Sequence, residues 1–364
     1  MWNFSEISWV CHEIALPQKI RIIPHEAWQC LSFPIPKKLM QTVIEMMNKQ
    51  IATGVLESCH ESYCNPWFLV KKKSEVYCFM VAAMKINTVT IRDAHMPPDV
   101  EDFAKNFAGM SASFLLNYFS RYNNITLHEE SRDMTAIQTP VGLLCQATLL
   151  QGTTNSVAQC QQVSNMILER NIPHDARVYI DDIGVRDPKT KYNETEALPE
   201  VRHYILEHLM ALDRVLVSIE LSGAKLSGEK SQFCQLGIII VGFACNYEGR
   251  HSEAAKVEKI INWPACWNIT EARAFIGVCV YYHIWIKDFA VIAQPIYVLF
   301  WKGQVFVWEG SQVKAMEILK LALTTAPALK SIDYEKEAGT IYCRVDASGD
   351  GWGGNLMQEE RGGK

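Results

Sequence analysis

The chain of 364 residues is long for a single domain, so we expect two or three lobes built around more than one core. Hydrophobic residues make up 49% of it and charged residues 21%, a composition that argues against a disordered protein. The formal net charge of −5 gives no support for nucleic-acid binding, because phosphate-binding proteins usually carry a basic excess. Any basic surface must therefore be local.

The chain shows no pattern of a membrane or secreted protein. Its longest apolar stretches, at about Leu236–Cys245 and Phe275–Trp285, are too short to span a bilayer. Residues Met1–Val10 lack the basic region and apolar run of a secretory signal. The 12 cysteines are irregularly spaced, with no Cys-x-x-Cys and no zinc pattern. We therefore expect reduced thiols in a cytoplasmic or nuclear protein that is neither secreted nor bound to a membrane.

The first part of the chain changes from an irregular to a patterned sequence. Residues 1–34 read as an irregular lead-in. Apolar residues at helical spacing predict a helix over Pro36–Gly54. The apolar runs Trp67–Lys73 and Tyr77–Ala82 predict a hairpin with a basic tip. Ser113–Leu116 predicts a strand that enters a helix or turn.

The second part predicts longer helices separated by short strands. Asn155–Arg170 and Val201–Leu221 have helical patterns, and the polar segment Arg186–Pro199 predicts an inserted loop. Ser231–Gly249 predicts two short strands around Gly242. Further expected elements are a helix over Thr270–Trp285 that starts near Thr270 and Glu271, a helix over Lys314–Thr325, and the paired strands Ile341–Asp346 and Trp352–Met357.

Two adjacent acids interrupt the apolar segment Val178–Val185. This pattern predicts a β-hairpin with Asp181 and Asp182 near its tip, because unpaired carboxylates are costly in a core. One interpretation is a divalent-metal site, since hard cations prefer oxygen ligands. The other is a solvated turn, in which Asp-Asp is common. The dipeptide alone favours the solvated turn, and only its sequence context favours the metal site.

That context is a series of motifs. Tyr179–Asp182 resembles the Tyr-x-Asp-Asp signature of reverse transcriptases, particularly those of gypsy-type LTR retrotransposons in fungi. Other segments from Pro34 onward resemble the same family in family order, which makes the resemblance specific although each motif is weak. These segments are Lys71–Lys73, Lys85–Asp93, Ser131–Ala136, Thr139–Gly142, Leu150–Ser156, Lys230–Phe233, Val241–Phe243, Trp263–Gly277, Phe306–Trp308 and Ala326–Leu329.

The resemblance implies an α+β fold, a right-hand polymerase with fingers, palm and thumb. A connecting segment and a truncated ribonuclease H-like β-hairpin would follow. The corresponding divisions are the irregular lead-in at 1–34, fingers and palm at 35–250, the thumb at 251–300, the connecting segment at 301–340 and the ribonuclease H-like start at 341–364.

The implied activity is that of an RNA-directed DNA polymerase. It would add deoxynucleoside triphosphates to a primer paired with an RNA or DNA template. Asp181 and Asp182 would hold two Mg²⁺ or Mn²⁺ ions for this nucleotidyl transfer. Tyr122 would pack beneath the sugar and help to reject a ribose, while Gln151 and Lys73 would belong to the nucleotide site.

This copy departs from the family pattern at three positions. Asn117 stands where the family has another metal-binding Asp, and an amide offers an oxygen but no negative charge. Losing about 4 kcal/mol of transition-state stabilisation would slow the reaction about a thousandfold. Arg121 replaces a glycine, and Cys78 replaces an arginine that would contact the triphosphate. Lys230 is retained, and either donates a proton to pyrophosphate or is simply solvated.

We therefore expect a degenerate and inactive copy of a reverse transcriptase. The alternative is a catalytically dead nucleic-acid-binding remnant, which requires its basic residues to line one cleft. The residues in question are Lys71–Lys73, Lys225, Lys230, Lys256, Lys259 and Arg273.

Near the C-terminus, Arg344–Ser348 and Gly351–Gly354 resemble the opening of a retrotransposon ribonuclease H. Asp346 would be its first metal ligand. Because the other acids would lie downstream, we expect no working ribonuclease H from these 364 residues. The glycines also match Gly-x-Gly-x-x-Gly, but too few residues follow for a dinucleotide-binding βαβ unit. Asp346–Gly349 likewise lacks the Asp-Ser/Thr-Gly pattern of an aspartic protease.

Overall fold

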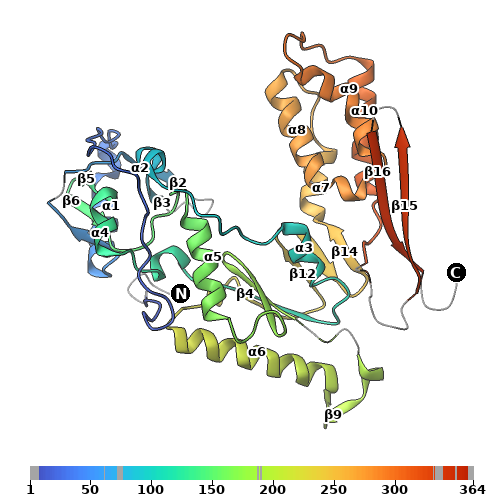
Figure 1. Ribbon diagram of the computed structural model, residues 1–364, viewed down its shortest axis with the longest axis horizontal. Helices are drawn as coiled ribbons and strands as arrows, with labels where there is room; N and C mark the ends of the chain where they lie inside the picture. Colours follow the sequence, from blue (N-terminus) through green and yellow to red (C-terminus); the bar gives the residue numbers. More distant parts are fainter. Residues whose placement is uncertain are drawn as a thin grey trace. The chain divides into compact units, whose positions relative to one another are not determined.

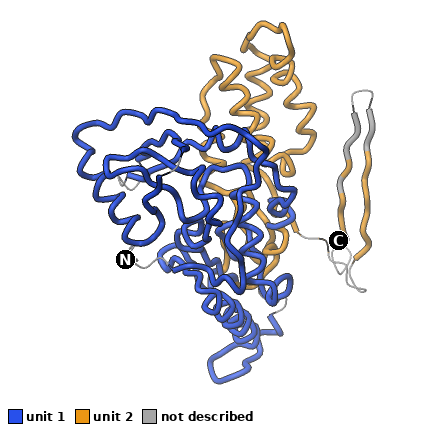
Figure 2. Tube along the Cα trace, turned by 60° about the vertical axis from the view of Figure 1, so that its left-hand side comes forward, with its two compact units in different colours: residues 1–103, 113–235 blue, residues 104–112, 236–364 orange. Residues whose placement is uncertain are grey.

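The computed structural model describes residues 8–60, 62–71, 77–186, 188, 191–330, 332, 339–348 and 351–359. The chain divides into two compact units (Figure 2). Unit 1 comprises Met1–Phe103 and Ser113–Gln235, and unit 2 comprises Ala104–Ala112 and Leu236–Lys364. Within the described ranges, no helix has both the length and the apolar character that a bilayer crossing requires.

The N-terminal part of unit 1 contains the predicted helix and hairpin (Figure 1). Helix α1 (Met40–Ala52) turns Val43 and Met47 into the core, as the helical spacing predicted. Strands β2 (Trp67–Lys71) and β3 (Tyr77–Val81) pair antiparallel, which confirms the predicted hairpin. Its basic tip, which includes Lys72 and Lys73, lies outside the described residues.

A second, three-stranded sheet completes this part of unit 1. Its strand order is β1 (Leu56–Ser58), β6 (Gly142–Gln146) and β5 (Ile137–Thr139), with both pairs antiparallel. One hydrophobic core joins residues of α1, this sheet and the β2–β3 hairpin, among them Trp67 and Leu144.

The central sheet of unit 1 carries the two adjacent acids. Its order is β11 (Gln232–Gln235), β4 (Ser113–Asn117), β8 (Asp182–Val185) and β7 (Ala176–Tyr179), all antiparallel. Strands β7 and β8 form the predicted hairpin, with the acids at its tip. Apolar side chains such as Leu116 and Ile183 are fully buried beneath this tip.

Two helices pack against this sheet (Figure 1). Helix α5 (Ser156–Ile167) contributes Cys160 and Val163 to the same core as the sheet residues. Helix α6 (His203–Ser222) contributes Val215 and stops at Gly223, whose φ of 73° suits a residue without a side chain. Both helices lie inside the predicted ranges except for Ser222.

The described part of the lead-in is irregular, as predicted, yet it belongs to the core of unit 1. Val10 and Ala15 are buried in the core of the central sheet. The backbone N–H of Val10 donates to the Asn124 carbonyl at 2.9 Å, and that of Cys11 donates to the Ser222 carbonyl at 2.8 Å. These contacts make the lead-in a structural part of the unit.

Short elements complete unit 1. The predicted loop Arg186–Pro199 contains a strand, β9, that pairs with β10, so it is not wholly irregular. The short elements are α2 (Met84–Val89), α3 (Val100–Lys105), whose last two residues belong to unit 2, α4 (Glu129–Arg132), β9 (Glu196–Leu198) and β10 (Val201–Arg202).

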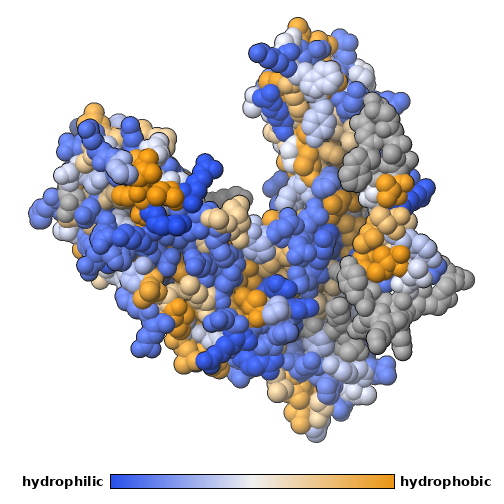
Figure 3. All heavy atoms as spheres, viewed as in Figure 1, coloured by the Kyte–Doolittle hydropathy of each residue, from blue (hydrophilic) through white to orange (hydrophobic). Residues whose placement is uncertain are grey.

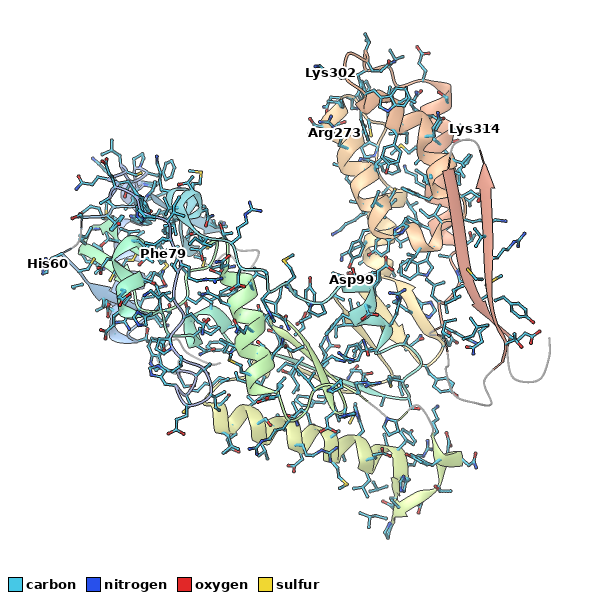
Figure 4. The ribbon with its side chains drawn as sticks, in the orientation of Figure 1. His60, Phe79, Asp99, Arg273, Lys302 and Lys314 are labelled. Atoms are coloured by element: carbon cyan, nitrogen blue, oxygen red, sulfur yellow. The ribbon has the colours of Figure 1, made fainter. Side chains whose placement is uncertain are left out.

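The described part of unit 2 includes a three-stranded sheet and four α-helices. The sheet is built from β12 (Gly237–Ile240), β13 (Phe243–Asn246) and β14 (Gly249–Ser252). The helices are α7 (Ala254–Ile261), α8 (Ile269–Tyr281), α9 (Phe289–Tyr297) and α10 (Gly310–Thr324). Figure 4 shows Arg273 on α8 and Lys314 on α10.

Unit 2 bears out its predicted helices and corrects two details. The cap of α8 is Asn268, whose side chain accepts from the Glu271 N–H, rather than Thr270. The two strands predicted around Gly242 are confirmed as β12 and β13, but the start of Ser231–Gly249 also forms β11, which joins the central sheet of unit 1. The predicted C-terminal hairpin is present as β15 (Ile341–Ser348) and β16 (Gly351–Gln358).

Candidate active site

A strained turn presents the two acids. Ile180 lies between β7 and β8 with a φ of 54°, in the left-handed region that disfavours β-branched residues. The buried side chain of Gln161, on α5, compensates for this strain. Its Oε1 accepts from the Ile180 N–H at 2.8 Å, and its Nε2 donates to the Val178 carbonyl at 3.0 Å. Helix α5 therefore fixes the conformation that places both carboxylates at the tip.

Gln161 is a functional candidate that the sequence analysis missed. Its side chain is 1% exposed, although glutamine is usually found on the surface. A polar residue on the buried side of α5, beside Cys160 and Ser164, was the only available signal. That signal does not reveal which backbone groups the amide would bind.

Asn117 directly faces one of the acids. The register of β4 and β8 places Asn117 opposite Asp182, and its Nδ2 donates to Asp182 Oδ1 at 2.7 Å. Burial raises the pKa of Asp182, while this hydrogen bond and the charge of Lys230 act to lower it. The amide therefore supplies Asp182 with the electropositive partner that a metal ion would otherwise provide.

One carboxylate oxygen of Asp181 lacks such a partner among the described residues. Its Oδ1 is buried and accepts no hydrogen bond from any residue that the structure describes. Burial and the neighbouring charge of Asp182 raise the pKa of Asp181, and the charges of Arg121 and Lys230 oppose this rise. A buried carboxylate oxygen without a donor is costly and favours a nearby cation.

A pocket of about 470 Å³ opens beside the acids, entirely within unit 1. Its wall includes residues from β3, among them Phe79, which Figure 4 labels. Asn117 and Asp182 do not line this pocket, but Asp182 directly follows the lining residue Asp181 and is hydrogen-bonded to Asn117. The predicted site residues that the fold brings together in its lining are Cys78, Arg121, Tyr122, Gln151, Asp181 and Lys230. The predicted residue Lys73 lies outside the described residues.

The pocket residues differ in charge and exposure. Tyr122 is half-buried, and burial together with the charges of Cys160 and Asp181 raises its pKa, so its hydroxyl stays protonated. Gln151 and Lys230 are exposed, and the face of unit 1 seen in Figure 3 is largely hydrophilic. Cys78 donates only a weak hydrogen bond, from Sγ to the carbonyl of Phe79 at 3.7 Å, and brings no cation to the pocket.

Arg121 occupies an unexpected place. The sequence suggested a bulky obstacle where the family has glycine, but its side chain is 2% exposed and directed into the core. Its Nη2 donates to Ser164 Oγ at 2.9 Å, and its guanidinium lies 4.2 Å from the centre of the Tyr118 ring. The left-handed residue here is Ser120, with a φ of 49°, so the backbone of Arg121 does not itself require glycine.

The side chains at the hairpin tip do not fit a pair of divalent ions. In the described part of the chain, no three His, Cys, Asp or Glu residues are grouped closely enough to hold a metal. Asp181 and Asp182 supply two carboxylates, and Asn117 turns its NH₂ group, not its carbonyl, toward Asp182. Two dications therefore lack the negative charge that would balance them.

The remaining predicted residues are distributed over both units. Lys71, Lys225 and Lys230 belong to unit 1, and only Lys230 of these lines the pocket. Lys256, Lys259 and Arg273 belong to unit 2. Asp346 lies on β15 opposite Gly353 of β16.

Comparison with known sequences identifies relatives of one kind. The chain is 26% identical to the Pol polyprotein of the Drosophila melanogaster transposon opus, over 96% of its length, and 24% identical to that of transposon gypsy, over 95%. It is 22% identical to a Schizosaccharomyces pombe Tf2 polyprotein over 90% of its length. The chain spans about a third of the two fly polyproteins, 35% and 34%. No protein-family model matches it.

Comparison with solved structures confirms the predicted fold. A foamy viral protease–reverse transcriptase in complex with double-stranded DNA matches 96% of the chain with a TM-score of 0.80 at 19% identity. The same kind of protein in complex with an RNA/DNA hybrid matches all of it with a TM-score of 0.77 at 18% identity. These matches cover 58% and 46% of the viral chains.

Proposed function

We propose that this chain, a relative of retrotransposon Pol polyproteins with the fold of a retroviral reverse transcriptase, is the polymerase segment of such a polyprotein. Its ancestral activity is RNA-directed DNA synthesis, and the residues at its polymerase site make the chain as given inactive. A fungal source, suggested by the motifs, remains a prediction, since the relatives come from both a fly and a yeast.

The observation that carries this proposal is the composition of the pocket in unit 1. Residues far apart in the sequence, from Cys78 to Lys230, line one space beside the Asp181–Asp182 tip. A tyrosine, a glutamine and a lysine around a carboxylate pair suit a nucleoside triphosphate, which has a sugar, a base and an anionic tail. We assign Tyr122 to the sugar, Gln151 to hydrogen bonding with the nucleotide and Lys230 to the pyrophosphate.

The same geometry explains why we propose inactivity. Transfer of a nucleotide requires cations to balance the triphosphate and the developing charge, usually two Mg²⁺ or Mn²⁺ ions. Asn117 removes one negative charge from the residues that would hold them and caps Asp182 with its amide. Cys78 further removes a fingers cation, so the triphosphate loses one contact as well.

We propose an RNA or DNA template with its primer, and deoxynucleoside triphosphates, as the ancestral ligands. Support comes from the foamy viral protease–reverse transcriptases, whose solved structures are complexes with double-stranded DNA and with an RNA/DNA hybrid. Synthesis on such a template would take place in the cytoplasm or nucleus. We extend the ribonuclease H assignment only to Asp346 and its hairpin.

Primer extension tests the proposal. The parent chain, Asp182→Ala, Asn117→Asp and the double variant Asn117→Asp/Asp182→Ala are supplied with an RNA template, a DNA primer and Mg²⁺ or Mn²⁺. We expect extension only by Asn117→Asp, because it restores the third carboxylate. Extension by the parent that Asp182→Ala abolishes would refute inactivity. Absence of extension in every variant would refute the view that Asn117 alone silences the site.

The hydrogen bond between Asn117 and Asp182 also favours a second candidate, a nucleic-acid-binding protein without chemistry. It gives Asp182 a hydrogen-bond donor in the absence of metal. In that case the parent chain binds primer–template with an affinity that falls steeply with salt, because released counterions drive such binding. Affinity that is independent of salt, or absent in dilute salt, would exclude this candidate.

A further inference from the structure

Arg121 brings a buried positive charge to this site, and burying a charge costs free energy. Its side chain is 2% exposed, and its Nε and Nη1 have no hydrogen-bond partner among the residues that the structure describes. An arginine remains charged at any ordinary pH, so burial cannot be relieved by loss of its proton. A buried charge of this kind persists only where a group of opposite sign lies near it.

The groups around the guanidinium narrow the choice of counter-charge. The Tyr118 ring, the Ser164 hydroxyl and the Cys160 thiol are among its contacts, and all three are neutral, since burial raises the pKa of the Cys160 thiol. Ser164 Oγ in turn lies 3.3 Å from the carbonyl of Ile180, the residue before Asp181. Asp181 lines the same pocket as Arg121 and has a buried oxygen that also lacks a partner. The two charged groups, each with a buried atom that lacks a hydrogen-bond partner, therefore border one pocket.

We propose that Arg121 is a resident cation that balances Asp181 in place of a metal ion and thereby weakens divalent-ion binding at the hairpin tip. This inference rests on the proposed function, since it takes Asp181 and Asp182 as the ancestral metal ligands. Arg121 repels an incoming dication, and the burial of its guanidinium leaves little solvent around the charge to screen this repulsion. Lys230 has the same sign, but its exposed position screens it.

The test is a titration of the full chain with Mn²⁺, in which the electron paramagnetic resonance signal reports the concentration of free Mn²⁺. Arg121→Met removes the charge and keeps the length of the side chain. We expect it to bind Mn²⁺ about tenfold more tightly than the parent, which corresponds to about 1.4 kcal/mol. Arg121→Lys keeps the charge and should bind Mn²⁺ as weakly as the parent. Asp182→Ala defines the background of Mn²⁺ bound elsewhere.

Arg186→Met is the matched control. Arg186 is a half-buried arginine of unit 1, but it follows the end of β8 that is opposite to Asp182. The same charge change there should leave Mn²⁺ binding at the tip unchanged. Arg121→Gln, which removes the charge but keeps a hydrogen-bond donor, serves as the test if Arg121→Met does not melt cooperatively.

The outcomes separate this inference from the proposed function. Equal Mn²⁺ affinity of the parent and the neutral Arg121 variant overturns the inference, whatever primer extension shows. An equal gain in Arg186→Met overturns it too, because net charge alone would then explain the effect. Tighter Mn²⁺ binding by Arg121→Met without primer extension by Asn117→Asp supports the inference and refutes the separate view that Asn117 alone silences the site.

Discussion

Replacing Asn117 with aspartate should destabilise the metal-free protein. In the parent, the amide donates to Asp182 Oδ1 at 2.7 Å, which is a charge-assisted hydrogen bond. In the variant, a carboxylate at position 117 takes the place of this donor. This new charge lies near Asp181 as well as Asp182. The change thus replaces an attraction by repulsion among three acids at one hairpin tip.

The size of the effect has an upper bound. Two unit charges about 4 Å apart repel by about 4 kcal/mol at an effective dielectric constant of about 20, and partial exposure of the tip reduces this. The folded state can also avoid this repulsion by binding one proton. At pH 7 this costs about 4 kcal/mol for a carboxylate with an ordinary pKa near 3.9, at about 1.36 kcal/mol per pH unit. We therefore expect Asn117→Asp to lose about 2 to 4 kcal/mol of unfolding free energy at pH 7.

The loss should depend on pH with a definite sign. Repulsion raises the folded-state pKa of the carboxylates above the unfolded value, so the folded state binds protons more tightly. The destabilisation is therefore present in full above the raised pKa, and it disappears as pH falls toward about 4. In that acidic range the new carboxyl group of the variant is protonated, and its O–H donates to Asp182 in place of the lost amide.

Urea denaturation in EDTA at pH 7 and pH 4.5 measures the effect. Asn117→Ala is the control, because it removes the amide without adding charge and should show a smaller loss that changes little with pH. Millimolar Mn²⁺ should restore stability to Asn117→Asp more than to the parent. If Asn117→Asp equals the parent at pH 7 in EDTA, the carboxylates are not in contact with residue 117 and the reasoning fails.

Three further changes test the supports of the site. Gln161→Met leaves the Ile180 N–H without its acceptor and should lower the unfolding free energy by about 2 to 3 kcal/mol in thermal melts. The control Gln162→Met should change it by less than about 1 kcal/mol, and equal losses in the two variants would contradict the role of Gln161. Removal of residues 1–15 uncovers the core around Val10 and should speed hydrogen exchange at the end of α6; unchanged exchange would show the lead-in to be dispensable. Because the pKa of Asp181 is raised, the parent should gain stability as pH falls from 7 through that pKa, and Asp181→Asn should lose part of this gain in urea titrations.

The elements that could be predicted best from the sequence are those in which apolar and polar residues follow a short, local pattern. Helix α1 follows from apolar spacing, and the β7–β8 hairpin follows from two acids between apolar runs. The strands after Ser231 were harder, because β11 pairs with β4, more than a hundred residues earlier. Local pattern cannot show which distant strand will be the neighbour.

The candidate site depended on the family resemblance more than on local pattern. Gln151 and Lys230 have nothing in their own neighbourhoods that links them to Asp181, and the fold alone places them in one pocket. The direction of the Arg121 side chain was also beyond prediction. A bulky residue in place of glycine suggested obstruction, whereas packing against Ser164 and Tyr118 turns it inward as a buried charge.

The two departures at Asn117 and Arg121 have one physical consequence. A cluster of carboxylates that binds metal ions is unstable when the ions are absent, because its charges repel and its oxygens lose solvent. Asn117 removes one of these charges and donates to Asp182, and Arg121 brings a positive charge toward Asp181. Each change reduces the net negative charge at the hairpin tip of the metal-free fold. Each change also weakens the metal binding on which catalysis would depend. The stability of the hairpin tip and its capacity for catalysis therefore depend on the same residues in opposite directions, so variants that restore metal binding should be less stable in EDTA than the parent.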